Sequence, residues 1–410
     1  MKDRTYQDVL QSGVSKPRRI ALFTGVYNHI ADGVSLTLNR LVEHLESIGD
    51  EVLVFAPTNE SPLVQHKGTL VPVPSFMAPG RPEYLLTTGI PSEARQRLRD
   101  FRPTLFHIAT PDFLGFRALR LAKSWNMPIV TSFHTHFSSY LKYYKLGAIE
   151  DPLWMWGRWF YGRCHQIYVP SMSIARMLRK RGIETDVRLW PRGVDSAFYN
   201  PGKRSMEWRR SIGISDNEVI VTFVSRLVWE KGLGVFADVI ESLSRDGIPH
   251  RSVIVGDGPA RHVLEERLPG TIFVGFKRGE ELATAYASSD IFLFPSDTET
   301  FGNVTLEAMA SGLPTVCADA SGSDALVLPG KTGYLVPPGE SQQFAAYLRE
   351  LVLNEELRKA YSRAATDAAI EYHWPSILAR LVGYYDELVG RVTSSIGKPR
   401  VPYEPSSLHS

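Results

Sequence analysis

Two carboxylates in one short segment, Glu299 and Glu307, have a spacing suited to binding the hydroxyl groups of a sugar. The segment 297–307 reads DTETFGNVTLE, which predicts a loop around Glu299 and the first turn of a helix around Glu307. A helix start also presents backbone N–H groups that bind phosphate oxygens. The segment could therefore hold a sugar joined to a phosphate. The alternative is an ordinary strand–loop–helix connection with two solvated acids.

Two regular elements are expected to position this segment. The apolar run 291–295 predicts a buried strand, and residues 304–311 predict a helix that ends at Gly312. The segment then lies at the carboxyl end of a strand, which is where open α/β sheets bind ligands.

A second loop, 225–232, leaves an apolar strand and enters a helix, and it contains Arg226 and Lys231. A guanidinium and an ammonium beside a helix amino terminus suit a diphosphate, because the helix end adds N–H groups of the backbone. The alternative is a solvated loop whose charge Glu230 balances. The presence of the carboxylate segment on an equivalent strand end favours the diphosphate.

The next predicted strand ends in a glycine turn that contains Gly256 and Gly258, and this turn permits close approach of the backbone to a ligand. A nicotinamide-binding motif would need a third glycine and a later acidic residue, and neither stands at the required position. A dehydrogenase is therefore disfavoured. A P-loop motif is also absent from the sequence.

Length and composition limit the class of protein. The chain has 410 residues, more than the roughly 250–300 that one core accommodates, so two domains are expected. A net charge of +2 gives no reason to expect nucleic acid as a partner. Cys164 and Cys317 suit small core positions in a reducing cytosol, without a disulfide or a structural metal. The sequence has no signal peptide or membrane-length apolar run, so we expect a cytoplasmic protein.

Short apolar runs alternate with amphipathic segments along the chain, which predicts an α/β fold of two doubly wound domains. The turn-rich residues around 191–203 are expected to link them. The expected division is a polar tail at 1–17, a first domain at 18–194, a second at 195–373, a helix crossing back to the first at 374–392, and a disordered tail at 393–410.

The loops described above also resemble the donor domain of retaining glycosyltransferases of family 4. Their motifs read S-R-L-x-x-x-K-G, then V-G-D-G-P, then E-T-F-G-N-V-x-L-E-A-M-A-S-G-L-P. The resemblance extends from about Arg18 to Leu388 and is greatest to lipid α-mannosyltransferases and sulfoquinovosyl-diacylglycerol synthases. It implies the GT-B fold, in which two Rossmann-like domains face each other across a cleft and bind acceptor and nucleotide-sugar donor.

The resemblance also implies roles for single residues. Glu299 would contact the donor sugar and Glu307 the ribose hydroxyls of the nucleotide, while Arg226 and Lys231 would hold the diphosphate. The backbone amides of Phe301, Gly302 and Asn303 would add to this contact. The version of the motif that continues into Val304 resembles mannosyltransferases, so GDP-mannose is the expected donor and a UDP-sugar the alternative. The expected acceptor is a lipid or a glycan.

In the first domain, the resemblance implies that His134, after the strand 129–132, contacts the donor sugar. A structural histidine, or a metal site with His136, are the alternatives. Gly33 could approach a phosphate. Asp32 stands where many relatives have a glycine, so this loop could instead meet the acceptor.

We expect no cofactor and no metal. Asp297 and Glu299 could form a magnesium site, but Arg226 and Lys231 already supply positive charge for a leaving diphosphate. The aromatic and cationic segments 140–146 and 154–163 could contact the cytoplasmic face of a membrane, or could pack within the domain. The competing functions are another GT-B enzyme, such as an epimerase or inverting transferase, and a non-catalytic nucleotide-sugar-binding protein.

Overall fold

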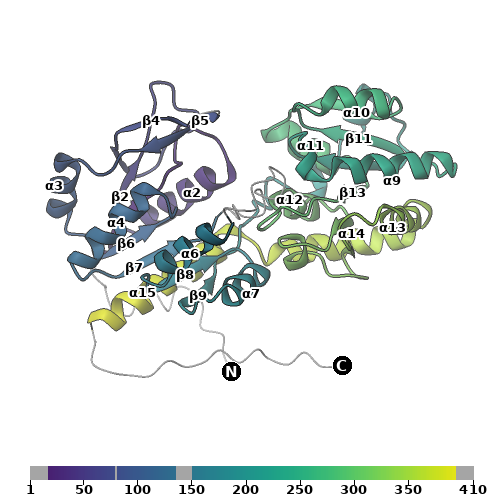
Figure 1. Cartoon of the computed structure of the whole chain (residues 1–410). Coiled ribbons are helices and arrows are strands. Elements are labelled where there is room, and N and C mark those ends of the chain that lie inside the picture. The colour runs from purple at the N-terminus through teal and green to yellow at the C-terminus, as the bar shows by residue number, and fades with distance from the viewer. Residues whose placement is uncertain (1–16, 79–80, 135–149, 394–410) are drawn as a thin grey trace, which may run out of the picture.

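The structure is a computed structural model that describes residues 17–78, 81–134 and 150–393. Within these ranges the chain forms two parallel sheets, each at the centre of its own domain (Figure 1). The expected pair of doubly wound α/β domains is therefore confirmed. The predicted tails and the aromatic segment 140–146 lie outside the described residues.

The first sheet has the order β3-β2-β1-β6-β7-β8-β9 in the described ranges. Its strands are β1 (Arg19–Phe23), β2 (Glu51–Ala56), β3 (Thr69–Pro72), β6 (Leu105–Ile108), β7 (Ile129–Ser132), β8 (Gln166–Val169) and β9 (Asp186–Leu189). Its helices are α2 (Gly33–Ser47), α3 (Ser92–Phe101), α4 (Phe113–Ser124), α6 (Glu150–Tyr161) and α7 (Met172–Lys180).

The second sheet has the order β12-β11-β10-β13-β14-β15. Its strands are β10 (Ile220–Val224), β11 (Arg251–Val255), β12 (Ile272–Gly275), β13 (Ile291–Phe294), β14 (Thr315–Ala318) and β15 (Gly333–Val336). Its helices are α8 (Met206–Ser211), α9 (Leu233–Arg245), α10 (Arg261–Arg267), α11 (Gly279–Ala287), α12 (Asn303–Ala310), α13 (Ser341–Leu353) and α14 (Glu355–Ile370).

The central strands are buried along their whole length, which explains why the sequence shows them as continuous apolar runs. Every residue of β6, β7, β10 and β13 is buried. Parallel strands covered on both faces have this pattern. The strand order reverses between β1 and β6 in one sheet and between β10 and β13 in the other, and such reversals open a place for ligands at the carboxyl ends.

The first domain departs from the predicted alternation. An antiparallel hairpin, β4 (Ser75–Ala78) and β5 (Arg81–Thr87), follows β3 instead of a helix. Prolines interrupt this stretch at 72, 74, 79 and 82, and β3 and β4 are half-exposed, so no strong apolar period marks them. The edge strands β9 and β15 were missed for the same reason, since their residues are only partly buried.

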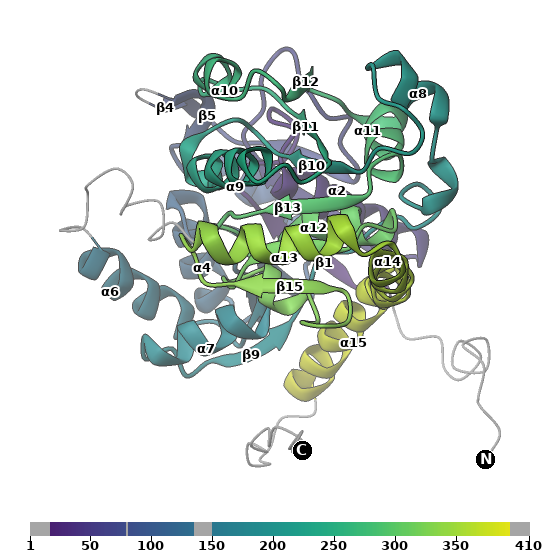
Figure 2. The same cartoon turned by 90° about the vertical axis from the view of Figure 1, so that its right-hand side faces the viewer.

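The last helix, α15 (Trp374–Thr393), leaves the second domain and packs on the first (Figures 1 and 2). Its apolar face joins Ile20, Leu22 and α2 in one core cluster. Arg18 donates to Asp386 at 2.5 Å and fixes the helix at its far end. The crossing lies beside the linker, since Val194 N–H donates to the Tyr372 carbonyl at 2.8 Å. The domain limits given above stay predictions.

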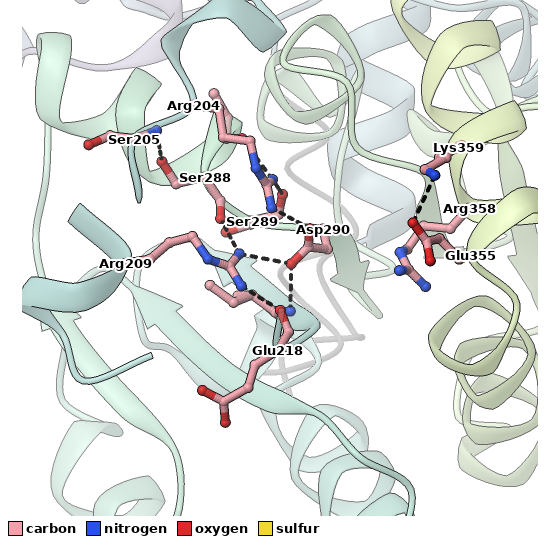
Figure 3. A network of polar contacts seen from close by, with 12 residues as sticks. Arg204, Ser205, Arg209, Glu218, Ser288, Ser289, Asp290, Glu355, Arg358 and Lys359 are labelled. Atoms are coloured by element: carbon pink, nitrogen blue, oxygen red, sulfur yellow. Dashed lines mark hydrogen bonds and ion pairs between the residues drawn. The ribbon is translucent and has the colours of Figure 1, made fainter. Parts of the chain in front are cut away.

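A buried charge cluster fixes the start of the second domain. Arg209 of α8 is fully buried and donates to Asp290 at 3.0 Å and to the Ser288 carbonyl at 2.9 Å. Arg204 donates to the other carboxylate oxygen of Asp290 at 2.8 Å, and Ile220 N–H donates to Asp290 at 2.8 Å (Figure 3). The cluster therefore joins the linker to the amino ends of β10 and β13.

Both cysteines are free and buried, as predicted. Among the helices of the described ranges, none is at once long enough and apolar enough to span a bilayer.

Candidate active site

Lys231 and Glu299 meet at the point where the second sheet reverses its strand order. Lys231 ends a 3-10 turn after β10, and Glu299 lies in the loop after β13. Lys231 Nζ lies 2.5 Å from Glu299 Oε1, with the side chains 10% and 20% exposed. Gly232 permits this approach, because it has φ of +74° and a Cβ there would lie 2.4 Å from the Pro295 carbonyl oxygen. The structure shows Lys231 paired with Glu299, whereas the alternative interpretation expected Glu230 to balance the charge of this loop.

Arg226 lies on the same loop as Lys231 but is exposed, and in the described part of the chain no carboxylate pairs with it. The glycine turn after β11 supports this loop. A Cβ at Gly256 would lie 1.9 Å from the Ser225 carbonyl oxygen, and one at Gly258 would lie 2.6 Å from that of Leu227. Both glycines therefore allow two neighbouring loops to touch through their backbones, and contact with a ligand remains a prediction for them.

The amino terminus of α12 is open to an anion. The helix begins at Asn303 after Gly302, which has φ of +85°, and no side chain caps its first turn. Phe301 anchors the loop, because its ring is buried 5.7 Å from the ring of Tyr372. Val304 is partly buried against the core of the second domain. The first N–H groups of α12 can thus bind phosphate oxygens.

Glu307 lies in the second turn of α12, not in the first as predicted, because the helix begins at Asn303. Tyr286 donates its hydroxyl hydrogen to Glu307 Oε2 at 3.2 Å, and the ring of Tyr199 lies 5.9 Å from that of Tyr286. Burial raises the pKa of Glu307 to about 7, although Tyr286 and Arg40 oppose the rise. Glu307 therefore occupies a separate, tyrosine-lined position on the same helix.

The first domain meets this edge directly. Thr300 Oγ1, next to Glu299, donates to the His134 carbonyl at 3.3 Å across the domains. Gly33, the first residue of α2, faces α12, since a Cβ there would lie 3.4 Å from Asn303 Nδ2. The carboxyl ends of both sheets therefore converge on the loop that carries Glu299.

His134 is buried and has a partner that the sequence analysis did not identify. Arg192 Nη2 lies 2.5 Å from His134 Nδ1, and Arg192 is itself only 5% exposed. Burial, followed by the charge of Arg192, holds the pKa of His134 well below its usual value. Recognition of β9 as a strand would have placed Arg192 at the carboxyl edge beside His134.

The chain matches known proteins over both domains. The sequence model described as "Glycosyltransferase Family 4" matches residues 31–198, and that described as "Glycosyl transferases group 1" matches residues 205–368. A GDP-mannose-dependent alpha-mannosyltransferase of Corynebacterium glutamicum is 32% identical over 92% of this chain and 90% of its own length. The chain belongs to glycosyltransferase family 4.

Other comparisons agree with this membership of family 4. The sulfoquinovosyl transferase SQD2 of Arabidopsis thaliana is 32% identical over 90% of this chain and 73% of its own length. Sucrose-phosphate synthase of Thermosynechococcus elongatus has the same fold, with a TM-score of 0.75, 20% identity and coverage of 91% of this chain and 99% of that structure. The two Rossmann-like domains of this family 4 protein therefore have the GT-B arrangement.

Asp32, which stands where many relatives have a glycine, caps a helix of the first domain. Its carboxylate caps α2 by accepting from Val34 N–H at 3.0 Å and Ser35 N–H at 2.8 Å. Asp32 thus occupies helix amides that a glycine would leave to a ligand, and contact of this loop with an acceptor stays a prediction. His136 lies outside the described residues.

The roles predicted for the site residues of this family 4 protein remain predictions, but their positions are clear. Lys231 pairs with Glu299, the His134 backbone contacts the neighbouring Thr300, Gly33 faces Asn303, and Glu307 and Arg226 stand apart. Within the described residues there is no group of three or more His, Cys, Asp or Glu side chains with metal-binding geometry.

Proposed function

We propose that this chain transfers a hexosyl group, α-mannosyl from GDP-mannose, to a hydroxyl of a lipid or glycan acceptor with retention of configuration. The observation that carries the proposal is the Lys231–Glu299 pair at 2.5 Å beside the Thr300–His134 contact between the domains. At this reversal of the strand order lie an ammonium that can bind phosphate and a carboxylate that can bind sugar hydroxyls.

The donor diphosphate, in this proposal, lies between Lys231, Arg226 and the first amides of α12. These groups stabilise the negative charge that grows on the leaving diphosphate, and pre-positioned donors of this kind make a large contribution to catalysis. Glu299 binds hydroxyls of the sugar. Glu307 accepts from the ribose hydroxyls, since among the described residues its carboxylate accepts from one hydroxyl, that of Tyr286, and has room for further donors.

We propose attack on the same face of the sugar from which the diphosphate leaves. Glu299 already faces an ammonium and serves to orient the sugar, so no covalent bond to it is required. The acceptor oxygen bonds to the anomeric carbon while the bond from that carbon to the phosphate oxygen breaks, and that oxygen receives the acceptor proton. We also propose that no metal or other cofactor takes part, because side chains and helix amides supply the positive charge.

The choice of donor rests on the relatives. The Corynebacterium glutamicum relative is described as GDP-mannose-dependent, which supports GDP-mannose here. The similarity to the sulfoquinovosyl transferase SQD2 supports transfer of a sugar other than mannose, and a UDP-sugar-dependent glycolipid or polysaccharide transferase stays the alternative.

A surface of the first domain supports a lipid acceptor and peripheral contact with the cytoplasmic face of a membrane. Trp156 and Trp159 of α6 stack with ring centroids 5.1 Å apart, and Arg163 Cζ lies 4.3 Å from the centroid of Trp159. Met155 on the same helix is 63% exposed. The two tryptophans are partly buried against the core of the domain, so the exposed part of this surface is Met155 with the neighbouring arginines, which suits a layer of acidic headgroups.

A donor panel tests the proposal. The purified protein is incubated with a lipid acceptor extract and GDP-mannose, UDP-glucose or a UDP-sulfoquinovosyl donor, with and without EDTA, and the anomeric configuration of the product is read by NMR. We expect mannosyl transfer with an α product that EDTA does not reduce. A β product contradicts retention, and loss of activity with EDTA contradicts metal independence.

Thermal unfolding provides an independent measurement of the nucleotide. A ligand that binds only the native state raises the melting temperature, so GDP is expected to raise it more than UDP. Lys231→Met is the control, because it should remove much of the rise. If GDP raises the melting temperature but no donor is hydrolysed or transferred, the protein is a non-catalytic binder. Flotation with vesicles of neutral lipid, with or without acidic lipid, tests the membrane contact.

A further inference from the structure

The bond between Arg192 and His134 fixes which ring nitrogen of the histidine carries hydrogen. A guanidinium has only donors, so at 2.5 Å His134 Nδ1 must accept with its lone pair. The hydrogen of the neutral imidazole then lies on Nε2. Sequence distance hides this pair, because 58 positions separate the two residues.

The surroundings keep the ring neutral. The ionisable groups that act on His134 within the described ranges are Arg192 and His107, and together with burial both lower its pKa. His107 is itself held neutral by complete burial, which lowers its pKa to about 3. His107 instead bonds through Nδ1 to the Tyr385 hydroxyl at 2.6 Å and through Nε2 to the Ser132 hydroxyl. Neither neighbour carries a carboxylate, which would favour the protonated form of His134.

The Nε2 atom of His134 has no acceptor among the described residues, although it is buried. The ring stands edge-on to Trp190, with centroids 5.5 Å apart, so packing holds its plane. A buried N–H without an acceptor costs free energy unless a ligand supplies one. Thr300, the neighbour of Glu299, contacts the backbone of this same histidine.

We propose that Arg192 is a positioning residue that holds His134 as the Nε2–H tautomer, so that this N–H donates to an oxygen of the transferred sugar. The sugar as acceptor rests on the proposed function, whereas the tautomer rests on the Arg192 contact alone. A rival explanation is purely structural. Arg192 also donates to the Trp190 carbonyl at 3.4 Å and stacks on the Trp190 ring at 5.3 Å, which could serve only to pack the linker.

Nitrogen NMR of the wild-type protein tests the tautomer, and a double-mutant cycle then separates positioning from packing. The full chain is labelled with ¹⁵N-histidine, and His134→Phe assigns the resonances. We expect a protonated Nε2 and an unprotonated Nδ1 at pH 6 to 8. A protonated Nδ1, or a doubly protonated ring, overturns the proposal. If this tautomer is present but no sugar is transferred, the positioning stands and the proposed function fails.

A double-mutant cycle tests whether Arg192 acts through the histidine. Arg192→Met is expected to lower kcat at least tenfold in the wild-type background, and to cost no further activity in the His134→Phe background. Arg192→Lys, which retains a cationic donor, should recover part of kcat and the tautomer. Each variant is first compared by circular dichroism and thermal unfolding. If the two substitutions multiply in the cycle, Arg192 acts as packing alone and the proposal is wrong.

Discussion

The strands β10 and β13 carry a charge cluster at each end, and the two clusters differ in how they are satisfied. At the amino ends, Arg209 is fully buried and donates to Asp290 and to backbone carbonyls (Figure 3). Arg204 and the N–H group of Ile220 donate to the same Asp290 carboxylate. At the carboxyl ends, Lys231 pairs with Glu299, whose side chain is 20% exposed.

This difference indicates what each cluster does. Several hydrogen bonds around one buried charge stabilise the fold, and removal of one partner leaves an uncompensated charge. A carboxylate that stays partly exposed at the rim of a sheet can exchange its ammonium partner for a ligand. We therefore predict that the cluster at the amino ends stabilises the fold and that the pair at the carboxyl ends binds substrate.

The largest effect is expected from Arg209→Met, which leaves Asp290 without its buried partner. The free energy of unfolding of the second domain should fall by about 3–5 kcal/mol, measured by urea unfolding. Turnover per folded molecule should stay unchanged. Lys359→Met, which removes an exposed ion pair with Glu355, is the control and should leave the midpoint unchanged. An unchanged midpoint for Arg209→Met would mean that the two clusters do not differ.

Lys231→Met should lower activity and leave stability nearly unchanged. Loss of one donor to a leaving group lowers kcat by about 10²–10³-fold, and the partly exposed Glu299 can then be hydrated, so the melting temperature should change little. Lys203→Met removes a surface pair with Glu280 in the same domain and should leave kcat unchanged. Equal losses in both variants would exclude a specific role for Lys231.

Glu307 predicts a pH dependence. Its pKa of about 7 means that the ionised form, which accepts from hydroxyls, is lost as the pH falls. The KM for the donor should rise roughly fivefold between pH 7 and pH 6, and Glu307→Gln should remove that dependence. A flat KM in the wild type across this range contradicts the role.

The raised pKa of Glu307 also affects stability, and there the effect works against the folded state as the pH rises. The folded state retains the Glu307 proton up to about pH 7, whereas the unfolded state loses it near the ordinary glutamate pKa of 4.5. The folded state binds more protons between these values, so the Glu307 contribution to stability decreases as the pH rises through that window. Urea unfolding of wild type and Glu307→Gln at pH 5 and pH 8 measures this difference.

The smallest effect is expected at Asp32, which lies at the ligand-binding edge but has its partners within the chain. Asp32→Ala removes the cap of α2 and should cost about 1 kcal/mol of stability, without a change in kcat. Asp32→Asn retains a capping side chain and should cost only a few tenths of that. A large loss of kcat in both variants would assign Asp32 to the substrate.

The sequence determined the alternation of strands and helices and the residues that stand at strand ends. Buried parallel strands read as apolar runs, so the loops with Arg226, Lys231 and Glu299 could be placed at one edge. The edge strand β9 was not predicted, because Asp186 and Arg188 interrupt it and leave no continuous apolar run to mark a strand. The helix start at Asn303 was also misplaced by one residue, which moved Glu307 to the second turn.

Only the tertiary structure decided which of these residues touch. A local sequence pattern holds no information on contacts between residues far apart in the chain. It therefore predicted neither the bond between Arg192 and His134 nor the contact of Thr300 with the first domain. It also suggested that Gly256 and Gly258 admit a ligand, whereas their missing side chains first admit a neighbouring loop. Residue types fix the chemistry that is available, and packing between distant segments decides which groups remain open to a substrate.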